Sequence, residues 1–167
     1  RTINESIANS LQKFIEQDIQ IIWQTGKAFY STALDAVNRT ANNENIKVFD
    51  FITTMDYAYA TANLVISRAG ASSVSELCIV KKPSILIPSP NVAEDHQTKN
   101  AMALVNKNAA VLVKDIDAKE KLADIAIELL NNKEEVLKLS DNIGKLALPD
   151  SADKIAKEVI KIISNKE

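Results

Sequence analysis

The chain has 167 residues, which is enough for one domain with a substantial core. Its composition, with 46% apolar and 25% charged residues, is ordinary for a soluble globular protein, and a formal net charge of −2 argues against a nucleic-acid partner. A single cysteine, Cys78, rules out an internal disulfide and predicts a buried side chain in a reducing compartment. No signal-peptide pattern and no apolar run of the roughly 20 residues that span a bilayer is present, so we expect an intracellular protein.

The first segment, INESIANSLQKFI, predicts one helix that begins close to Arg1. A crossover unit in a parallel sheet runs from strand to loop to helix, so this helix lacks the strand that should precede it. We therefore expect a first strand and its loop upstream of residue 1. The apolar residues that recur at helical spacing are Ile3, Ile7, Leu11, Phe14 and Ile15.

Short apolar runs and amphipathic helices then alternate along the chain. Strands that are apolar throughout and separated by helices are typical of a parallel sheet covered on both faces. The sequence therefore predicts an α/β fold, a doubly wound parallel sheet of at least four strands, followed by three closing helices. The expected strands lie near residues 19–23, 46–50, 64–67, 84–87 and 110–113.

The segment RAGASSVSEL, residues 68–77, follows the third expected strand and contains one of only three glycines in the chain. Ligands of open parallel sheets bind where strands end and helices begin. Gly70 and Ala71 allow the backbone to approach a ligand, and the free N–H groups at the start of the next helix favour an anion. Ser72 and Ser73 stand at this helix start, so the segment is a candidate phosphate site.

The same segment has a second interpretation, in which Ser72 or Ser73 only caps the helix. Glu76 would then complete a capping box on Ser73 through the S-x-x-E spacing, and the residues alone favour this interpretation. A Glu76 carboxylate can instead accept two hydrogen bonds from a vicinal diol such as a ribose. No G-x-G-x-x-G or P-loop motif is present.

The loop SPNVAEDHQTKN, after the fourth expected strand, contains the only histidine of the chain, His96. With Gln97 and Asn100 it shares one face of the helix that follows, and three such side chains suit a polyhydroxylated ligand such as a sugar. An ordinary solvated helix start is the alternative. No cysteine or second histidine stands beside His96, so no metal site is expected. Lys27, in QTGK, is either a surface lysine or a phosphate contact.

Two stretches, LVISRAGASSVSEL and PSPNVAEDHQTKNA, resemble the C-terminal half of the MurG family of UDP-N-acetylglucosamine transferases. A KP pair and an apolar strand separate the stretches, and the order of elements agrees over nearly the whole chain. The resemblance implies a GT-B architecture, in which two Rossmann-like domains enclose the active site. Residues 1–167 would be the domain that binds the UDP-sugar donor, and the acceptor domain would be absent.

The resemblance also implies a role for each candidate residue. The backbone at Ile52, in DFITTM, reads the uracil, and Glu76 holds the ribose hydroxyls. Gln97 contacts the N-acetylglucosamine with Asn100 nearby, whereas His96 stands at a position where relatives vary. The residues that hold the ribose and diphosphate follow Gly70 directly: Ala71, Ser72, Ser73, Val74, Ser75 and Glu76.

The resemblance places the general base in the absent acceptor domain, so no catalytic residue, metal or cofactor is expected in this chain. The implied partners are UDP-N-acetylglucosamine and, through the absent domain, a lipid-linked muramyl-pentapeptide acceptor and the membrane. The implied location of the whole enzyme is the cytoplasmic face of the cell membrane. The alternatives are another GT-B enzyme, such as a UDP-N-acetylglucosamine epimerase or a lipid-A disaccharide synthase, or a nucleotide-binding module without catalysis.

Overall fold

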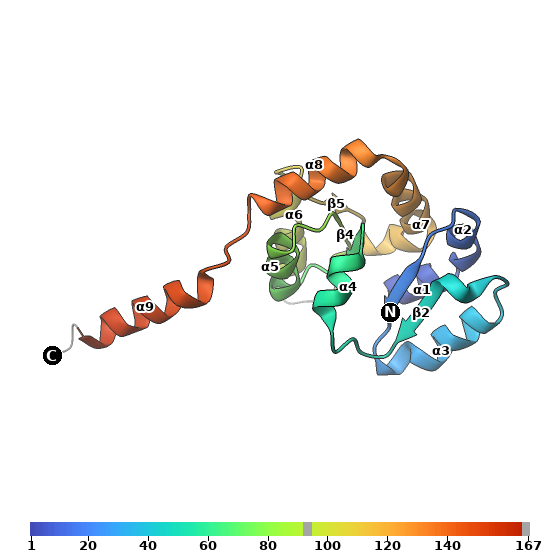
Figure 1. Ribbon diagram of the computed structural model, residues 1–167, viewed down its shortest axis with the longest axis horizontal. Coiled ribbons are helices and arrows are strands. Elements are labelled where there is room, and N and C mark those ends of the chain that lie inside the picture. Colours follow the sequence, from blue (N-terminus) through green and yellow to red (C-terminus); the bar gives the residue numbers. More distant parts are fainter. Residues whose placement is uncertain (92–94, 165–167) are drawn as a thin grey trace.

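The computed structural model describes residues 1–91 and 95–164, and strands alternate with helices along this part of the chain (Figure 1). Each expected strand is present close to its predicted place, and every strand pair is parallel, as predicted. The strands are β1 (Ile21–Gln24), β2 (Ile46–Phe49), β3 (Val65–Ser67), β4 (Ser84–Leu86) and β5 (Val111–Leu112).

The strands form two sheets, one of β1 and β2 and one with the order β3-β4-β5. The expectation of one sheet with at least four strands is therefore wrong for the residues described. A sheet is continuous only where backbone N–H and C=O groups of adjacent strands meet, and no described strand pairs with β1 on the side away from β2 or with β3 on the side away from β4.

The opening helix is in fact two helices, α1 (Thr2–Ala8) and α2 (Leu11–Glu16). The N–H of Ser10 donates to the carbonyl of Ile7 at 3.0 Å, which closes a tight turn at Asn9 and Ser10. Asn and Ser favour such turns because their side chains compete for backbone hydrogen bonds. The remaining helices are α3 (Lys27–Asn38), α4 (Met55–Thr61), α5 (Ala71–Ile79), α6 (His96–Val105), α7 (Asp115–Asn131), α8 (Lys133–Gly144) and α9 (Ser151–Ser164).

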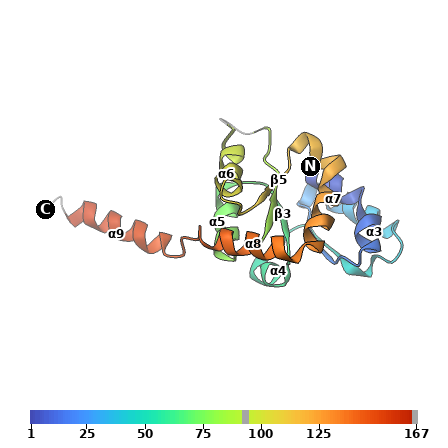
Figure 2. The same cartoon turned by 90° about the horizontal axis from the view of Figure 1, so that it is seen from above.

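Both faces of the β3-β4-β5 sheet are covered by helices, which confirms the doubly wound arrangement (Figure 2). Successive residues of a strand point to opposite faces, and on β4 Ile85 belongs to one core cluster and Leu86 to the other. Leu122 of α7 lies in the cluster of Ile85. Leu77 of α5 and Ile143 of α8 lie in the cluster of Leu86.

Cys78 is buried in the second of these clusters, as the sequence predicts, and burial raises the pKa of its thiol. A thiol of this kind remains protonated and unreactive at neutral pH. Its role is that of a small apolar side chain.

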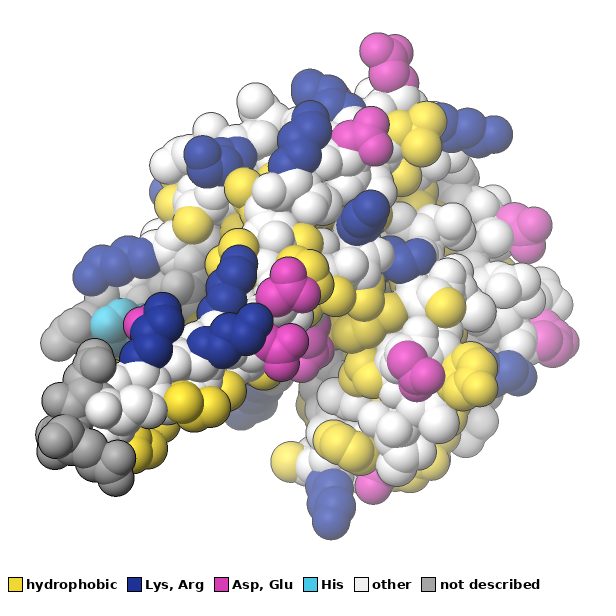
Figure 3. Space-filling view, turned by 60° about the vertical axis from the view of Figure 1, so that its left-hand side comes forward, with side chains coloured by type: hydrophobic (Ala, Val, Ile, Leu, Met, Phe, Trp, Pro, Cys, Tyr) yellow, Lys and Arg dark blue, Asp and Glu magenta, His cyan; other side chains and the backbone are white. Residues whose placement is uncertain are grey.

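The last helix, α9, extends away from the body of the molecule (Figures 1 and 2). All of its residues are exposed, and apolar side chains line it (Figure 3). The exposed apolar residues of α9 are Ile155, Val159, Ile160, Ile162 and Ile163. Within residues 1–91 and 95–164, no helix has the length and apolar character that crossing a bilayer requires.

Candidate functional site

The start of α5 lies directly after β3, where the sequence predicts an anion site. Gly70 is the N-cap residue, α5 begins at Ala71, and no side chain caps the helix. The interpretation in which Ser72 or Ser73 caps α5 is therefore wrong, because both serines lie within its first turn. The first N–H groups of a helix have no partner within it and carry partial positive charge, so this end of α5 can receive an anion.

The chain's own packing does not require glycine at position 70. The backbone φ of Gly70 is −64°, which any residue adopts, and an added Cβ would have only the Ser73 Oγ within van der Waals range, at 3.8 Å. The described residues therefore leave room beside Gly70 for an added side-chain carbon. Val74 and Ser75 complete the first turns of α5.

Glu76 lies on α5 and bonds to a residue that sequence analysis did not single out. The hydroxyl of Tyr59, on α4, donates to Glu76 Oε2 at 3.2 Å. Burial, and then the negative charge of Glu76, raise the pKa of Tyr59, so its hydroxyl stays protonated and remains a donor. The other carboxylate oxygen, Oε1, has no partner among the described residues, and Glu76 is exposed. A carboxylate held at one oxygen and open at the other can accept from a diol.

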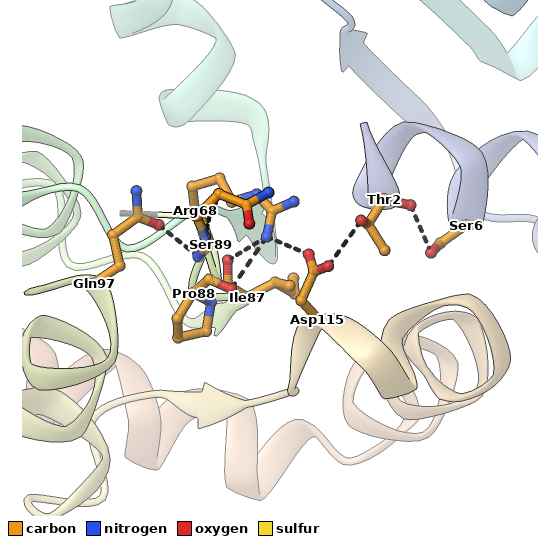
Figure 4. A network of polar contacts seen from close by, with 9 residues as sticks. Thr2, Ser6, Arg68, Ile87, Pro88, Ser89, Gln97 and Asp115 are labelled. Carbon is orange, nitrogen blue, oxygen red and sulfur yellow. Dashed lines mark hydrogen bonds and ion pairs between the residues drawn. The ribbon is translucent and has the colours of Figure 1, made fainter. Parts of the chain in front are cut away.

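Gln97 and Asn100, on α6, each hold one of the loops that follow the strands. The N–H of Ser89, after β4, donates to Gln97 Oε1 at 2.9 Å (Figure 4). Asn100 Nδ2 donates to the carbonyl of Ala69 at 3.0 Å. These bonds leave Gln97 Nε2 as a donor and Asn100 Oδ1 as an acceptor. His96 is exposed at the first residue of α6. Residues 92–94 of the same predicted loop lie outside the described part of the chain.

Arg68 joins several elements beneath these loops, and sequence analysis missed it (Figure 4). One guanidinium nitrogen, Nη1, donates to the carbonyls of Ile87 and Pro88 at 3.1 and 3.2 Å and pairs with Asp115 Oδ1 at 2.5 Å. Thr2 Oγ1 donates to the second oxygen of Asp115 at 2.9 Å. The ends of β3 and β4 are thereby fixed to α7 and α1.

Ile52 lies in the loop after β2, and one of its two backbone polar groups already has a hydrogen-bond partner. Its N–H donates to Gln24 Oε1 at 2.8 Å, and the neighbouring N–H of Phe51 donates to Asp50 Oδ1 at 2.8 Å. No described group donates to the carbonyl of Ile52. Ile52 also lines a cavity of about 330 Å³ together with Phe49, Phe51 and Thr54, a space of the size that small ligands occupy.

A larger groove, of about 1160 Å³, lies between α1 and α3 at the end of β1. Gly26 has φ +74°, a conformation that favours glycine, and Lys27 is exposed at the start of α3. Glu5 bonds to Lys119 and Arg1 at 2.6 Å each, and these bonds lower the pKa of Glu5 to about 2. In residues 1–91 and 95–164, no group of three His, Cys, Asp or Glu side chains is placed to hold a metal ion.

Relatives of the chain were found by sequence and by structure. The chain is 56% identical over 163 residues to the UDP-N-acetylglucosamine--N-acetylmuramyl-(pentapeptide) pyrophosphoryl-undecaprenol N-acetylglucosamine transferase of Bacteroides fragilis, a match that covers 97% of this chain and 43% of that protein. The protein of the same name from Parabacteroides distasonis is 54% identical over 168 residues, covering 99% of this chain and 45% of that protein. The chain therefore spans less than half the length of these relatives.

A solved structure has the same fold. It is a crystal structure of MurG from Acinetobacter baumannii, similar with a TM-score of 0.79 and 24% identity, over 93% of this chain and 46% of that one. The family profile described as the glycosyltransferase family 28 C-terminal domain matches residues 1–156. Because the profile covers most of the sequence and the fold agrees, the chain belongs to the family of glycosyltransferase family 28 C-terminal domains.

Proposed function

We propose that this chain is the UDP-N-acetylglucosamine-binding part of a transferase that moves N-acetylglucosamine to a lipid-linked muramyl-pentapeptide acceptor in peptidoglycan synthesis. One observation carries the proposal. The uncapped start of α5, which suits a diphosphate, lies one turn from Glu76, whose open carboxylate oxygen suits a ribose. The names of the curated relatives supply the donor sugar and the acceptor.

In this proposal the start of α5 acts on the leaving group. As the sugar departs, negative charge grows on the diphosphate of UDP, and N–H groups already aimed at that position stabilise the charge without reorganising. The N–H groups concerned are those of Ala71, Ser72 and Ser73. No side chain of this domain needs to exchange a proton for this step.

We assign the sugar to Gln97 and Asn100, through the groups that their loop contacts leave open. Gln97 Nε2 can donate to a sugar oxygen, and Asn100 Oδ1 can accept from a hydroxyl. Each amide would then connect the sugar to a loop of the binding site. His96 has only a peripheral place in this assignment.

We further propose that residues 1–167 form the donor domain of a two-domain enzyme, with a strand upstream of α1 that pairs between β1 and β3. The interruption of the sheet at these strands, the exposed apolar side chains of α9 and the greater length of the relatives support this. The general base, the acceptor site and the contact with the cytoplasmic face of the membrane would belong to the rest of the protein. We expect no sugar transfer by residues 1–167 alone, because correct orientation of the two substrates lowers the activation barrier by about 7 to 11 kcal/mol and these residues cannot orient the acceptor.

Calorimetric titration of the chain with UDP, UDP-N-acetylglucosamine, UDP-glucose and ADP tests the proposal. UDP should bind, UDP-N-acetylglucosamine should bind more tightly than UDP-glucose, and ADP should bind much more weakly than UDP. Equal affinities for ADP and UDP, or no binding of UDP at all, would contradict a uridine nucleotide site.

A further inference from the structure

Gln24 is the last residue of β1 and lies opposite Phe49 in the register with β2. From there its side chain reaches the loop after β2, where Oε1 accepts the N–H of Ile52 at 2.8 Å. Gln24 itself is exposed, whereas Ile52 is half-buried. The Gln24 side chain can therefore move into water without opening a cavity in the core.

The chemistry of the Gln24 side chain matches uracil, the base that the family resemblance places at the backbone of Ile52. A carboxamide presents a carbonyl acceptor next to an N–H donor, and one edge of uracil, O4 and N3–H, presents the same pair. Ile52 offers the complementary pair, an N–H and a carbonyl. Cytosine has an amino donor where uracil has O4, so in the same orientation it offers no acceptor to the N–H of Ile52.

We propose that the carboxamide of Gln24 is a stand-in for the base in the unliganded chain, and that uracil displaces it from the N–H of Ile52. This inference rests on the proposed function, because it needs UDP as the ligand, and it places the uracil at the backbone of Ile52, as the family resemblance implies. Gln24 keeps the loop at residues 50–54 in the conformation that reads the base. Uracil then exchanges one hydrogen bond for another of the same kind, so this contact selects the base more than it adds affinity.

The neighbouring contact provides an internal reference. The N–H of Phe51 donates to Asp50 Oδ1, within the same loop, and does not depend on Gln24. A substitution of Gln24 that only disorders the loop changes both amides, whereas loss of the stand-in changes the amide of Ile52 alone.

Amide hydrogen exchange and chemical shifts of the nitrogen-15-labelled chain test the displacement. Without ligand, Gln24→Leu should remove the protection of the Ile52 amide and leave that of Phe51 unchanged. With saturating UDP, the Ile52 amide should have the same shift and protection in the wild-type and Gln24→Leu chains. With CDP, the chemical shift and protection of the wild-type Ile52 amide should stay as they are without ligand.

Affinity gives a second measurement. A carboxylate holds an N–H about twice as strongly as an amide oxygen and offers no donor, so Gln24→Glu should weaken UDP binding roughly tenfold relative to Gln24→Leu. Gln20→Glu adds the same charge just before β1 and controls for repulsion of the diphosphate. A tenfold loss in Gln20→Glu as well would assign the effect to charge and overturn the assignment to Gln24.

Two results separate this inference from the proposed function. If the wild-type chain binds UDP but its Ile52 amide remains different from that of Gln24→Leu at saturation, Gln24 stays in place and the displacement is wrong. If the wild-type chain does not bind UDP, the proposed function fails, and the inference that rests on it fails too.

Discussion

The side chain of Asn100 donates from Nδ2 to the carbonyl oxygen of Ala69, at 3.0 Å. Ala69 is fully buried and immediately precedes Gly70, the N-cap residue of α5. A residue of α6 therefore sets the position of the backbone that opens the candidate anion site. The contact connects the two loops that the sequence marks as separate binding segments.

We expect Asn100→Asp to weaken both folding and nucleotide binding. The substitution replaces the Nδ2 donor by an acceptor, which leaves the buried carbonyl of Ala69 without its partner, at a cost of about 1 to 3 kcal/mol. Denaturant unfolding measures the loss, and titration with UDP should show a several-fold weaker affinity. The exposed Asn106→Asp, at the other end of α6, introduces the same charge and should change neither quantity.

Glu76→Gln should weaken UDP binding while leaving the fold intact. Glu76 is exposed, and an amide has one acceptor oxygen where a carboxylate has two. Hydrogen bonds to charged groups contribute about 1.5 to 3 kcal/mol, so UDP should bind roughly ten- to a hundredfold more weakly. Glu120→Gln, on the exposed face of α7, is the charge-matched control. If the wild-type chain binds 2′-deoxy-UDP as tightly as UDP, Glu76 does not hold the ribose diol.

Tyr59→Phe should reduce the preference for UDP over 2′-deoxy-UDP without removing the carboxylate. The substitution deletes the hydroxyl that holds Glu76 Oε2, so the carboxylate samples more orientations. We expect the ratio of the two affinities to fall by a factor of about 2 to 12, since one such bond contributes about 0.5 to 1.5 kcal/mol. In a Glu76→Gln background, Tyr59→Phe should have no further effect on the ratio. An unchanged ratio in the wild-type background would mean that Tyr59 does not position Glu76.

Arg68→Lys should destabilise the chain although it keeps the charge. A lysine amine lacks the planar fork of a guanidinium and cannot serve Asp115 and the carbonyls of Ile87 and Pro88 in the same way. Arg68 is 29% exposed, so we expect a loss of about 1 to 3 kcal/mol in the free energy of unfolding. Arg39→Lys, at the exposed C-cap position that follows α3, should cost far less. Equal losses in the two variants would mean that Arg68 does not connect these elements.

Glu5 should make the stability of the folded chain depend on pH in the acidic range. Hydrogen bonds from Lys119 and then Arg1 lower the pKa of Glu5 from 4.5 to about 2 in the folded state. The contribution of Glu5 is therefore complete above pH 4.5 and is lost as the pH falls towards 2. Thermal unfolding should show Glu5→Gln to be less stable than wild type at neutral pH, with a difference that shrinks in acid. A difference independent of pH would mean that the two pairs do not act through the charge of Glu5.

Much of the fold was predictable because its signals are local. An apolar run flanked by helical periodicity marks a strand wherever it lies in the chain, and β1 to β5 are found where such runs occur. The two stretches around Gly70 and Gln97 are likewise contiguous, so their resemblance to one family required no knowledge of packing. The sequence by itself determined the α/β class, the parallel strands and the loops that carry the candidate site.

Packing decided which groups in those loops are engaged. Tyr59 and Glu76 are 17 positions apart, Gln24 and Ile52 are 28 apart, and Arg68 and Asp115 are 47 apart. No spacing rule joins such pairs, because a hydrogen bond depends on where the two elements meet in space. The S-x-x-E pattern illustrates the same limit. It is typical of a capping box, but α5 begins at Ala71, so both serines lie inside the helix and Glu76 is free to meet Tyr59 instead.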